Sequence, residues 1–126
     1  MGKSIVIVGA SPNRRKFSNK AVRAFRDGGW TVIPVNPAFD DIEGLCCYRK
    51  LSDVPGPVDR VTMYVGPAIG KTMLDDLAVL KPAEVFFNPG SADEDLITQA
   101  RLKGLNAIEA CSIVNIGLRP EMYPDE

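Results

Sequence analysis

The sequence predicts a single α/β domain in which helices cover both faces of a mainly parallel, five-stranded sheet. Short apolar segments alternate along the chain with segments whose apolar residues recur at helical spacing, and this alternation predicts strand–helix units. The length of 126 residues fits one domain with its own core. With 45% hydrophobic and 25% charged residues, the composition is that of an ordinary globular protein.

Five apolar segments are short enough to be buried strands, and most end at Gly, Asn or Pro. They are Ser4–Val8, Trp30–Val35, Arg60–Val65, Glu84–Phe87 and Asn106–Ala110. The Pro-, Gly- and Asp-rich stretch 38–59 holds at most a short edge strand near Cys46–Tyr48 and one helical turn at Ser52–Val54.

Amphipathic helices are predicted between these strands. The first has its apolar stripe at Phe17, Ala21, Val22 and Phe25 and ends at Gly28-Gly29. The second begins at Gly66-Pro67 and continues to Pro82. The third begins at a capping box, Ser91–Glu94, and ends at Lys103 before Gly104. A short last helix capped by Ser112 precedes a tail, 119–126, that is expected to be irregular.

Repeated strand–helix units of this length predict a Rossmann-like, doubly wound three-layer sandwich with right-handed crossovers. In such folds ligands bind at the carboxyl ends of the strands, where the strand order reverses. Four strand exits carry unusual loops that we expect at this edge: Gly9–Pro12, Asn36–Pro37, Gly66–Pro67 and Asn88–Ser91.

Charge is distributed unevenly along the chain, although the formal net charge is only −1. The first 26 residues contain seven basic residues and no acidic one, whereas the remaining hundred contain eight basic and sixteen acidic residues. This asymmetry predicts a local anion site on an acidic body. It does not favour a nucleic-acid-binding protein, whose basic surface usually dominates the domain.

The loop after the first strand has the composition of a phosphate-binding loop. Gly9 permits a sharp turn, Ser11 offers an N–H and a hydroxyl, and the helix start near Ser18 adds free N–H groups. The basic residues that follow add formal charge, and arginine binds phosphate bidentately. The predicted phosphate site comprises Gly9, Ala10, Ser11, Arg14, Arg15, Lys16 and Ser18.

Two better-known nucleotide motifs are absent. A dinucleotide fingerprint needs glycines where Ser11 and Arg14 stand, and no acidic residue closes the second strand to bind a ribose. The segment Gly66–Thr72 resembles a P-loop but has three residues between its glycines instead of four. Classical NAD and nucleoside-triphosphate sites are therefore disfavoured.

The sequence offers little for catalysis or metal binding. It has no histidine, which excludes Ser-His-Asp and Cys-His machinery, a phosphohistidine intermediate and His-ligated zinc. Cys46, Cys47 and Cys111 do not have zinc or thioredoxin spacing, and we expect all three to be small buried side chains in a reducing compartment. Cys111 ends the last strand and is expected near the ligand edge. No apolar run is long enough to span a membrane, so we expect a cytoplasmic protein.

Several of these segments together resemble the small stand-alone coenzyme A-binding protein family, which looks like the nucleotide-binding domain of the succinyl-CoA synthetase alpha subunit without its catalytic domain. The resemblance extends from Ser4 to about Ile116. It lies in Val8–Asn13 with Ser18, Val32–Pro37, Leu51–Pro55 before Val58-Asp59, Val65–Pro67 and Asn88–Gly90. The chain departs from the family at Cys111–Val114, where a Cys-Pro pair is common.

The resemblance implies which residues contact CoA. Ser11 and the stretch Arg14, Arg15 and Lys16 would hold phosphates, including the 3′-phosphate. Val35, Asn36 and Pro37 would flank the adenine and ribose. Val65, Gly66 and Pro67, with Asn88, Pro89 and Gly90, would line the pyrophosphate and pantetheine path.

We therefore expect one CoA-binding, Rossmann-like domain over residues 1–126 that binds CoA or acyl-CoA without catalysis, as a sensor, carrier or regulatory domain. Ligase activity is not implied, because the phosphohistidine and the ligase domain are missing. Two alternatives stay open: an NAD(P)-dependent or acyl-transferring enzyme, and a protein-interaction module with a vestigial nucleotide site. The sequence also leaves open a homodimer or another protein partner.

Overall fold

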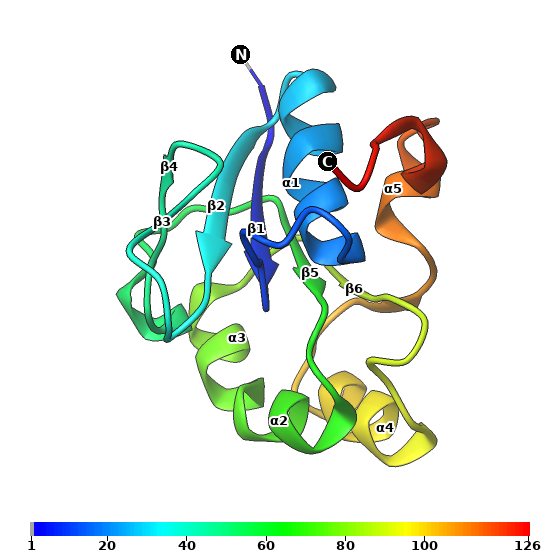
Figure 1. Ribbon diagram of the computed structural model, residues 1–126. Helices are drawn as coiled ribbons and strands as arrows, with labels where there is room; N and C mark the ends of the chain where they lie inside the picture. Colours follow the sequence, from blue (N-terminus) through cyan, green and yellow to red (C-terminus); the bar gives the residue numbers. More distant parts are fainter. Residues whose placement is uncertain (1) are drawn as a thin grey trace.

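A computed structural model describes residues 2–126 and contains a parallel sheet covered by helices (Figure 1). The sheet has five strands. The strand order is β2-β1-β5-β6-β7, and all neighbouring pairs are parallel. The strands are β1 Ser4–Val8, β2 Thr31–Val35, β5 Arg60–Met63, β6 Glu84–Phe87 and β7 Ala107–Glu109. The predicted α/β class and the five-stranded parallel sheet are therefore confirmed.

Helices cover both faces of the sheet, as predicted. They are α1 Phe17–Asp27, α2 Pro67–Thr72, α3 Leu74–Leu80, α4 Glu94–Leu102 and α5 Ser112–Asn115. Figure 1 shows α1 and α5 on one face and α2, α3 and α4 on the other. Alternate residues of β1 divide between the two cores, because successive side chains of a strand point to opposite faces. Ile5 and Ile7 pack with α1, whereas Val6 and Val8 pack with α2–α4.

The strand order reverses between β1 and β5. From β1 the chain crosses through α1 to β2 on one side, and then returns past β1 to β5 on the other. The two crossovers leave on opposite faces, so the loops that follow β1 and β5 diverge at the carboxyl edge. This divergence opens a crevice at the carboxyl ends of β1 and β5.

Two helix boundaries differ from the prediction. The helix predicted from Gly66 to Pro82 is two helices, because the Met73 N–H bonds to the Gly70 carbonyl three residues back and interrupts the α-helical ladder. The cap of α4 is Asp93, whose Oδ1 accepts from the Leu96 N–H at 2.8 Å, and not Ser91. Ser91 instead donates its hydroxyl to the Asn88 carbonyl at 2.7 Å.

The loop-rich stretch after β2 forms a small hairpin of β3 Asp41–Ile42 and β4 Leu45–Cys46. A parallel bridge between Val35 and Tyr48 and a 3-10 turn at Leu51–Asp53 follow it, close to the predicted edge strand and helical turn. Burial of all three cysteines was a wrong prediction. Cys47 is buried, Cys111 is half-buried, and Cys46 is exposed because it lies at the end of the outlying hairpin.

The end of the chain is more ordered than predicted. Ser112 is the first residue of α5 and does not cap it, because Cys111 occupies the N-cap position. The tail contains a 3-10 turn, Pro120–Met122, and then buries Tyr123. The Tyr123 hydroxyl donates to the Asp27 carboxylate at 3.1 Å, which ties the tail to the end of α1.

Gly9 is the position where substitution is expected to disturb the carboxyl edge of the sheet. Its φ is +83°, and an added Cβ would lie 3.0 Å from Val65 Cγ1 and 3.1 Å from the Tyr64 carbonyl oxygen. We predict that Gly9→Ala lowers the free energy of unfolding by about 3 kcal/mol, since backbone strain and steric overlap add. Urea unfolding at pH 7 measures this difference.

Gly29→Ala is the matched control, because Gly29 has φ +85° but no atom within 4 Å of an added Cβ. Gly29→Ala is expected to lower the free energy of unfolding by about 1–2 kcal/mol, from backbone strain alone. Equal losses in the two variants would show that the approach of Gly9 to the loop after β5 does not constrain the fold.

Candidate functional site

Three cavities lie along the carboxyl edge of the sheet. The largest, here called the β2-side cavity, has a volume of about 410 Å³. Its wall comprises Val8, Gly9, Val35, Asn36, Pro37, Arg49, Lys50, Leu51, Val65, Ile69 and Met73. Apolar side chains from the strand ends and α2 therefore face two cationic residues, a combination that suits an aromatic ring linked to an anion.

A second cavity, the α1-side cavity, lies on the other face of the same edge and has a volume of about 280 Å³. It is lined by Phe17, Tyr64, Asn88, Pro89, Cys111, Ile113 and Pro120. No charged residue belongs to this wall, so the cavity suits an apolar group. Cys111 therefore lies at the carboxyl edge of the sheet, together with the loops from which the sequence predicted a ligand site.

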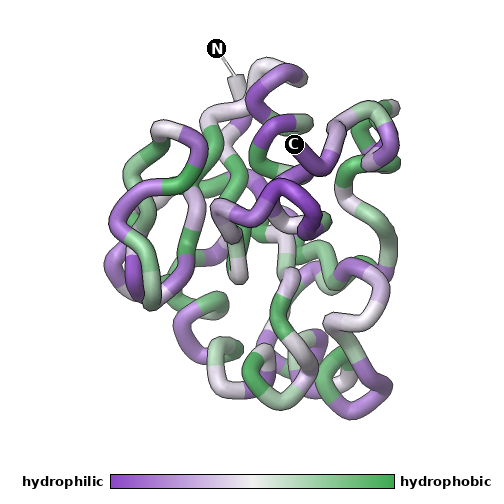
Figure 2. Tube along the Cα trace, viewed as in Figure 1, coloured by the Kyte–Doolittle hydropathy of each residue, from purple (hydrophilic) through white to green (hydrophobic). Residues whose placement is uncertain are grey.

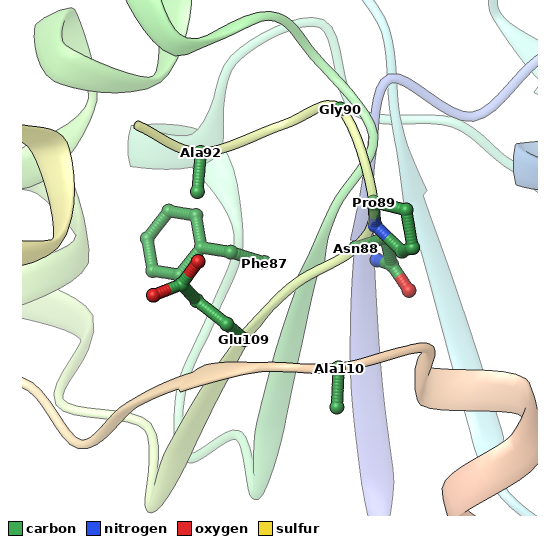
Figure 3. Close-up of a pocket in the computed structure, with 7 residues that line it drawn as sticks. All are labelled: Phe87, Asn88, Pro89, Gly90, Ala92, Glu109 and Ala110. Carbon is green, nitrogen blue, oxygen red and sulfur yellow. The ribbon is translucent and has the colours of Figure 1, made fainter. Parts of the chain in front are cut away.

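The third cavity, of about 240 Å³, lies between the ends of β6 and β7. Figure 3 shows its lining residues, with the Glu109 carboxylate beside the Phe87 ring. Asn88, Pro89 and Gly90 come from the exit loop of β6. Because the only ionisable residue in this wall is an acid, the cavity is unfavourable for a phosphate.

The cavities bring together about half of the predicted site residues. Gly9, Val35, Asn36, Pro37 and Val65 line the β2-side cavity. Asn88 and Pro89 line both of the other cavities, and Gly90 lines the third one only. The remaining predicted residues line none of the three cavities: Ala10, Ser11, Arg14, Arg15, Lys16, Ser18, Gly66 and Pro67. Ala10, Ser11 and Ser18 are buried, and the basic loop is exposed and strongly hydrophilic (Figure 2).

Gly9 sets the geometry where the two main cavities meet. Its N–H donates to the Val35 carbonyl at 2.9 Å, which ties the turn to the end of β2. On its other side the turn approaches Tyr64 and Val65, as the short Cβ distances show. Tyr64 lines the α1-side cavity and Val65 lines the β2-side cavity, so the loop after β5 separates the two.

Two asparagines of the predicted site hold the loops in place through their side chains. Asn36 Nδ2 donates to the Ala10 carbonyl at 2.8 Å, and its Oδ1 accepts from the Ala38 N–H at 2.9 Å. Buried Asn88 donates to the Met63 carbonyl at 2.9 Å and accepts from the Ser112 N–H at 2.9 Å. Both amides are occupied within the protein, so these residues shape the edge rather than offer free side-chain donors.

Arg14 is paired with an acid that the sequence reading did not connect with it. Arg14 Nε and Nη2 donate to the two carboxylate oxygens of Glu43, at 3.0 and 2.6 Å. Asn19 Nδ2 donates to Glu43 and to the Ser11 carbonyl. Glu43 thus joins the hairpin β3–β4 to the first loop, and an anion would have to compete with it for Arg14.

Arg23 extends this network beneath the loop. It is buried, and it donates to Asn19 Oδ1 at 2.8 Å and to the Arg14 carbonyl at 3.1 Å. Lys20 pairs with Asp125 at 2.8 Å. Several of the early basic residues are therefore neutralised internally, whereas the exposed Arg15 and Lys16 side chains have no ion pair among residues 2–126.

Arg49 and Lys50 are the two basic cavity residues that sequence reasoning missed. Arg49 donates to Asp40 Oδ1 at 2.7 Å and to the Pro37 carbonyl at 2.8 Å, and Asp40 is mostly exposed. Lys50 has no ion pair among the residues that the structure describes. Their only signal in the sequence was a pair of basic residues before Leu51, within a stretch expected to be a loop.

Neither a cluster of metal ligands nor a membrane-spanning helix is found in the described part of the chain. Within residues 2–126, no group of three or more Cys, Asp and Glu side chains is placed to hold a metal ion. None of the helices over the same residues is long and apolar enough to cross a membrane.

The strand order, with its reversal between β1 and β5, defines a Rossmann-like, doubly wound α/β domain with a crevice at the switch point. A family model described as "CoA binding domain" matches residues 3–117, and the chain belongs to that family.

Comparison with curated proteins finds partial matches. The chain is 34% identical over 62 residues to the uncharacterized protein YneT of Bacillus subtilis, covering 49% of this chain and 46% of YneT. It is 28% identical over 74 residues to an ADP-forming acetate–CoA ligase of Methanocaldococcus jannaschii, covering 59% of this chain and 10% of the ligase. The matched segment thus spans less than half of either relative.

Solved structures match over more of the chain. A conserved hypothetical protein from Pyrococcus furiosus has 30% identity and a TM-score of 0.83, covering 90% of this chain and 98% of that one. A dinucleotide-forming acetyl-coenzyme A synthetase from Ca. Korarchaeum cryptofilum has 27% identity and a TM-score of 0.74, covering 84% of this chain and 25% of the synthetase.

The Glu43 ion pair predicts a pH dependence of stability. The hydrogen bonds from Arg14 are the main cause that lowers the pKa of Glu43 from 4.5 to about 2. Folded Glu43 therefore stays ionised where the unfolded side chain is protonated, so the pair stabilises the fold above about pH 5. This stability is lost as the pH falls toward 2. Because Arg14 is partly exposed, we predict that Glu43→Gln costs about 2 kcal/mol at pH 7.

Urea unfolding of the wild type and Glu43→Gln between pH 7 and pH 2 measures this effect. The difference in unfolding free energy should shrink below pH 5 and be small near pH 2. Asp75→Asn is the control, because it removes an exposed pair with Lys103 and should cost less than about 1 kcal/mol. A pH-independent cost of Glu43→Gln would contradict the assignment.

Proposed function

We propose that this protein binds coenzyme A or an acyl-CoA at the carboxyl edge of the sheet, as a non-catalytic sensor, carrier or regulatory domain. The observation that carries the proposal is the β2-side cavity, where apolar walls meet two cationic residues beside the Gly9 turn. Membership of the CoA binding domain family supports the same ligand.

The adenosine part fits the β2-side cavity. Val35, Ile69 and Met73 offer apolar surface for the adenine ring, and Lys50 and Arg49 stand at the wall for the 3′-phosphate. The Arg49–Asp40 pair is exposed, so its rupture by a phosphate costs little. A phosphate with two negative charges is a stronger partner for a guanidinium than a single carboxylate.

The pyrophosphate fits the loops on either side of Gly9. Within residues 2–126, the backbone N–H groups of Ser11, Val65 and Gly66 donate no hydrogen bond to the protein. They flank the point where the loops after β1 and β5 approach each other. Free backbone N–H groups at such a crevice bind phosphate oxygens, and Arg15 and Lys16 add long-range attraction from the first loop.

The non-catalytic part of the proposal is based on which acid–base side chains the chain contains and where they lie. The sequence contains no histidine, so a phosphohistidine cannot form and the usual general base of acyl transfer is missing. Glu43, the acid whose pKa is lowered most among the described carboxylates, is held by Arg14 and Asn19 and lines none of the three cavities. The edge therefore has the groups that bind a nucleotide without an evident acid–base pair.

Lys50 and Arg49 provide the test of this proposal. We predict that Lys50→Ala weakens CoA binding about tenfold, because it removes a charge-assisted contact to the 3′-phosphate. Arg49→Ala should act in the same direction. Isothermal titration calorimetry with CoA and 3′-dephospho-CoA measures this, and the variants should lose affinity for CoA much more than for dephospho-CoA.

Lys103→Ala is the matched control, because Lys103 lies at the end of α4 near the opposite edge of the sheet. It should leave both affinities unchanged. If the wild type bound neither compound, the proposed function would be wrong. If Lys50→Ala and Arg49→Ala weakened both ligands equally, the β2-side cavity would not hold the 3′-phosphate.

A further inference from the structure

The α1-side cavity has a different chemistry from the rest of the edge. The cavity has a volume of about 280 Å³ and no charged residue in its wall. The apolar lining residues are Phe17, Pro89, Ile113 and Pro120, and the polar ones are Tyr64, Asn88 and Cys111. Of the polar residues, Asn88 already uses its amide on Met63 and Ser112. The cavity therefore offers mainly apolar surface, to which Tyr64 and Cys111 also contribute.

The Tyr64 hydroxyl is buried without a hydrogen-bond partner among the described residues. Burial is the main cause that raises its pKa above the usual range, so it stays a neutral donor. Thr62 lies near enough to lower the pKa of Tyr64, but no hydrogen bond of good geometry joins the two side chains. Since the hydroxyl oxygen is closed to solvent, Tyr64 adds its ring and not a free donor to the cavity wall.

The cavity continues the proposed CoA path. Tyr64 belongs to its wall and Val65, the next residue, belongs to the β2-side cavity. A ligand whose pyrophosphate crosses the loop after β5 therefore reaches the α1-side cavity with its far end. Cavities for whole ligands have volumes of roughly 300–1,000 Å³, so one of 280 Å³ holds only the end of such a ligand.

We propose that the α1-side cavity is the acyl pocket of this protein and that its ligand is the thioester of CoA with a short, uncharged acyl group. The inference rests on the proposed CoA binding and adds the class of acyl group. The apolar wall holds the alkyl chain of the acyl group. A dicarboxylic acyl group such as succinyl is rejected, because its free carboxylate would be buried without a cation.

The experiment is isothermal titration calorimetry of the full chain with CoA, butyryl-CoA and succinyl-CoA. Butyryl-CoA should bind about tenfold more tightly than CoA, because its methylenes leave water for the apolar wall. Succinyl-CoA should bind no more tightly than CoA. Equal affinities for CoA and butyryl-CoA, or a preference for succinyl-CoA, would overturn the acyl pocket.

Two variants locate the preference. Cys111→Leu should fill the cavity and abolish the preference for butyryl-CoA over CoA. Phe17→Ala opens the wall from a side chain that is 61% exposed, so the fold should survive and the preference should fall below about threefold. Val79→Ala is the matched control, since Val79 is 81% exposed on α3 and lines none of the three cavities.

The two proposals fail in different ways. If Phe17→Ala loses the preference for butyryl-CoA over CoA and Val79→Ala keeps it, the acyl pocket is supported. If Phe17→Ala and Cys111→Leu both fold and both keep the preference, the acyl group binds elsewhere. If the wild type binds neither CoA nor butyryl-CoA, the proposed function itself fails. If it binds both equally, CoA binding stands and only the acyl pocket falls.

Discussion

The close approach of Gly9 to the loop after β5 is the constraint on which the carboxyl edge depends. An added Cβ would lie about 3 Å from Tyr64 and Val65, so only glycine brings the two diverging loops this near. The same residue ties the turn to β2 through Val35. Because Tyr64 and Val65 face different cavities, this one contact sets the boundary between an apolar cavity and a partly cationic one. The strand-order reversal creates the crevice, and Gly9 determines its width.

Around this contact, polar side chains that look suited to binding a ligand instead hold the loops of the carboxyl edge together. Asn36 and Asn88 use their amides to hold loops and strand ends together. Glu43, Asn19 and Arg23 do the same beneath the first loop. The polar residues therefore divide into a buried or half-buried set that fixes the loops and an exposed set. In the exposed set, Arg15, Lys16 and Lys50 have no ion pair among residues 2–126. Fixed loops of this kind favour binding, because fewer side chains must be ordered when the ligand arrives.

Local sequence patterns predicted the sheet, its parallel strands and the edge at which the loops gather. β1 and β6 were placed within their observed bounds, because buried strands of four or five apolar residues have few alternatives. The helix predicted over 66–82 missed its break at Met73, which depends on one backbone hydrogen bond. The pairing of Arg14 with Glu43 was also missed, because 29 residues separate them and no local pattern encodes that contact. Arg49 and Lys50 reach the cavity through the path of a long loop, which composition alone does not fix.

The central claim is that one extended ligand occupies both sides of the Gly9 contact. The most direct measurement is a titration of the ¹⁵N-labelled protein with CoA, followed by the backbone amide shifts. The account predicts shift changes at Ser11, Lys50, Val65 and Gly66, with smaller changes at Cys111, and little change at Gly104 on the opposite edge. Changes confined to the amino edge of the sheet, or to one cavity only, would contradict it.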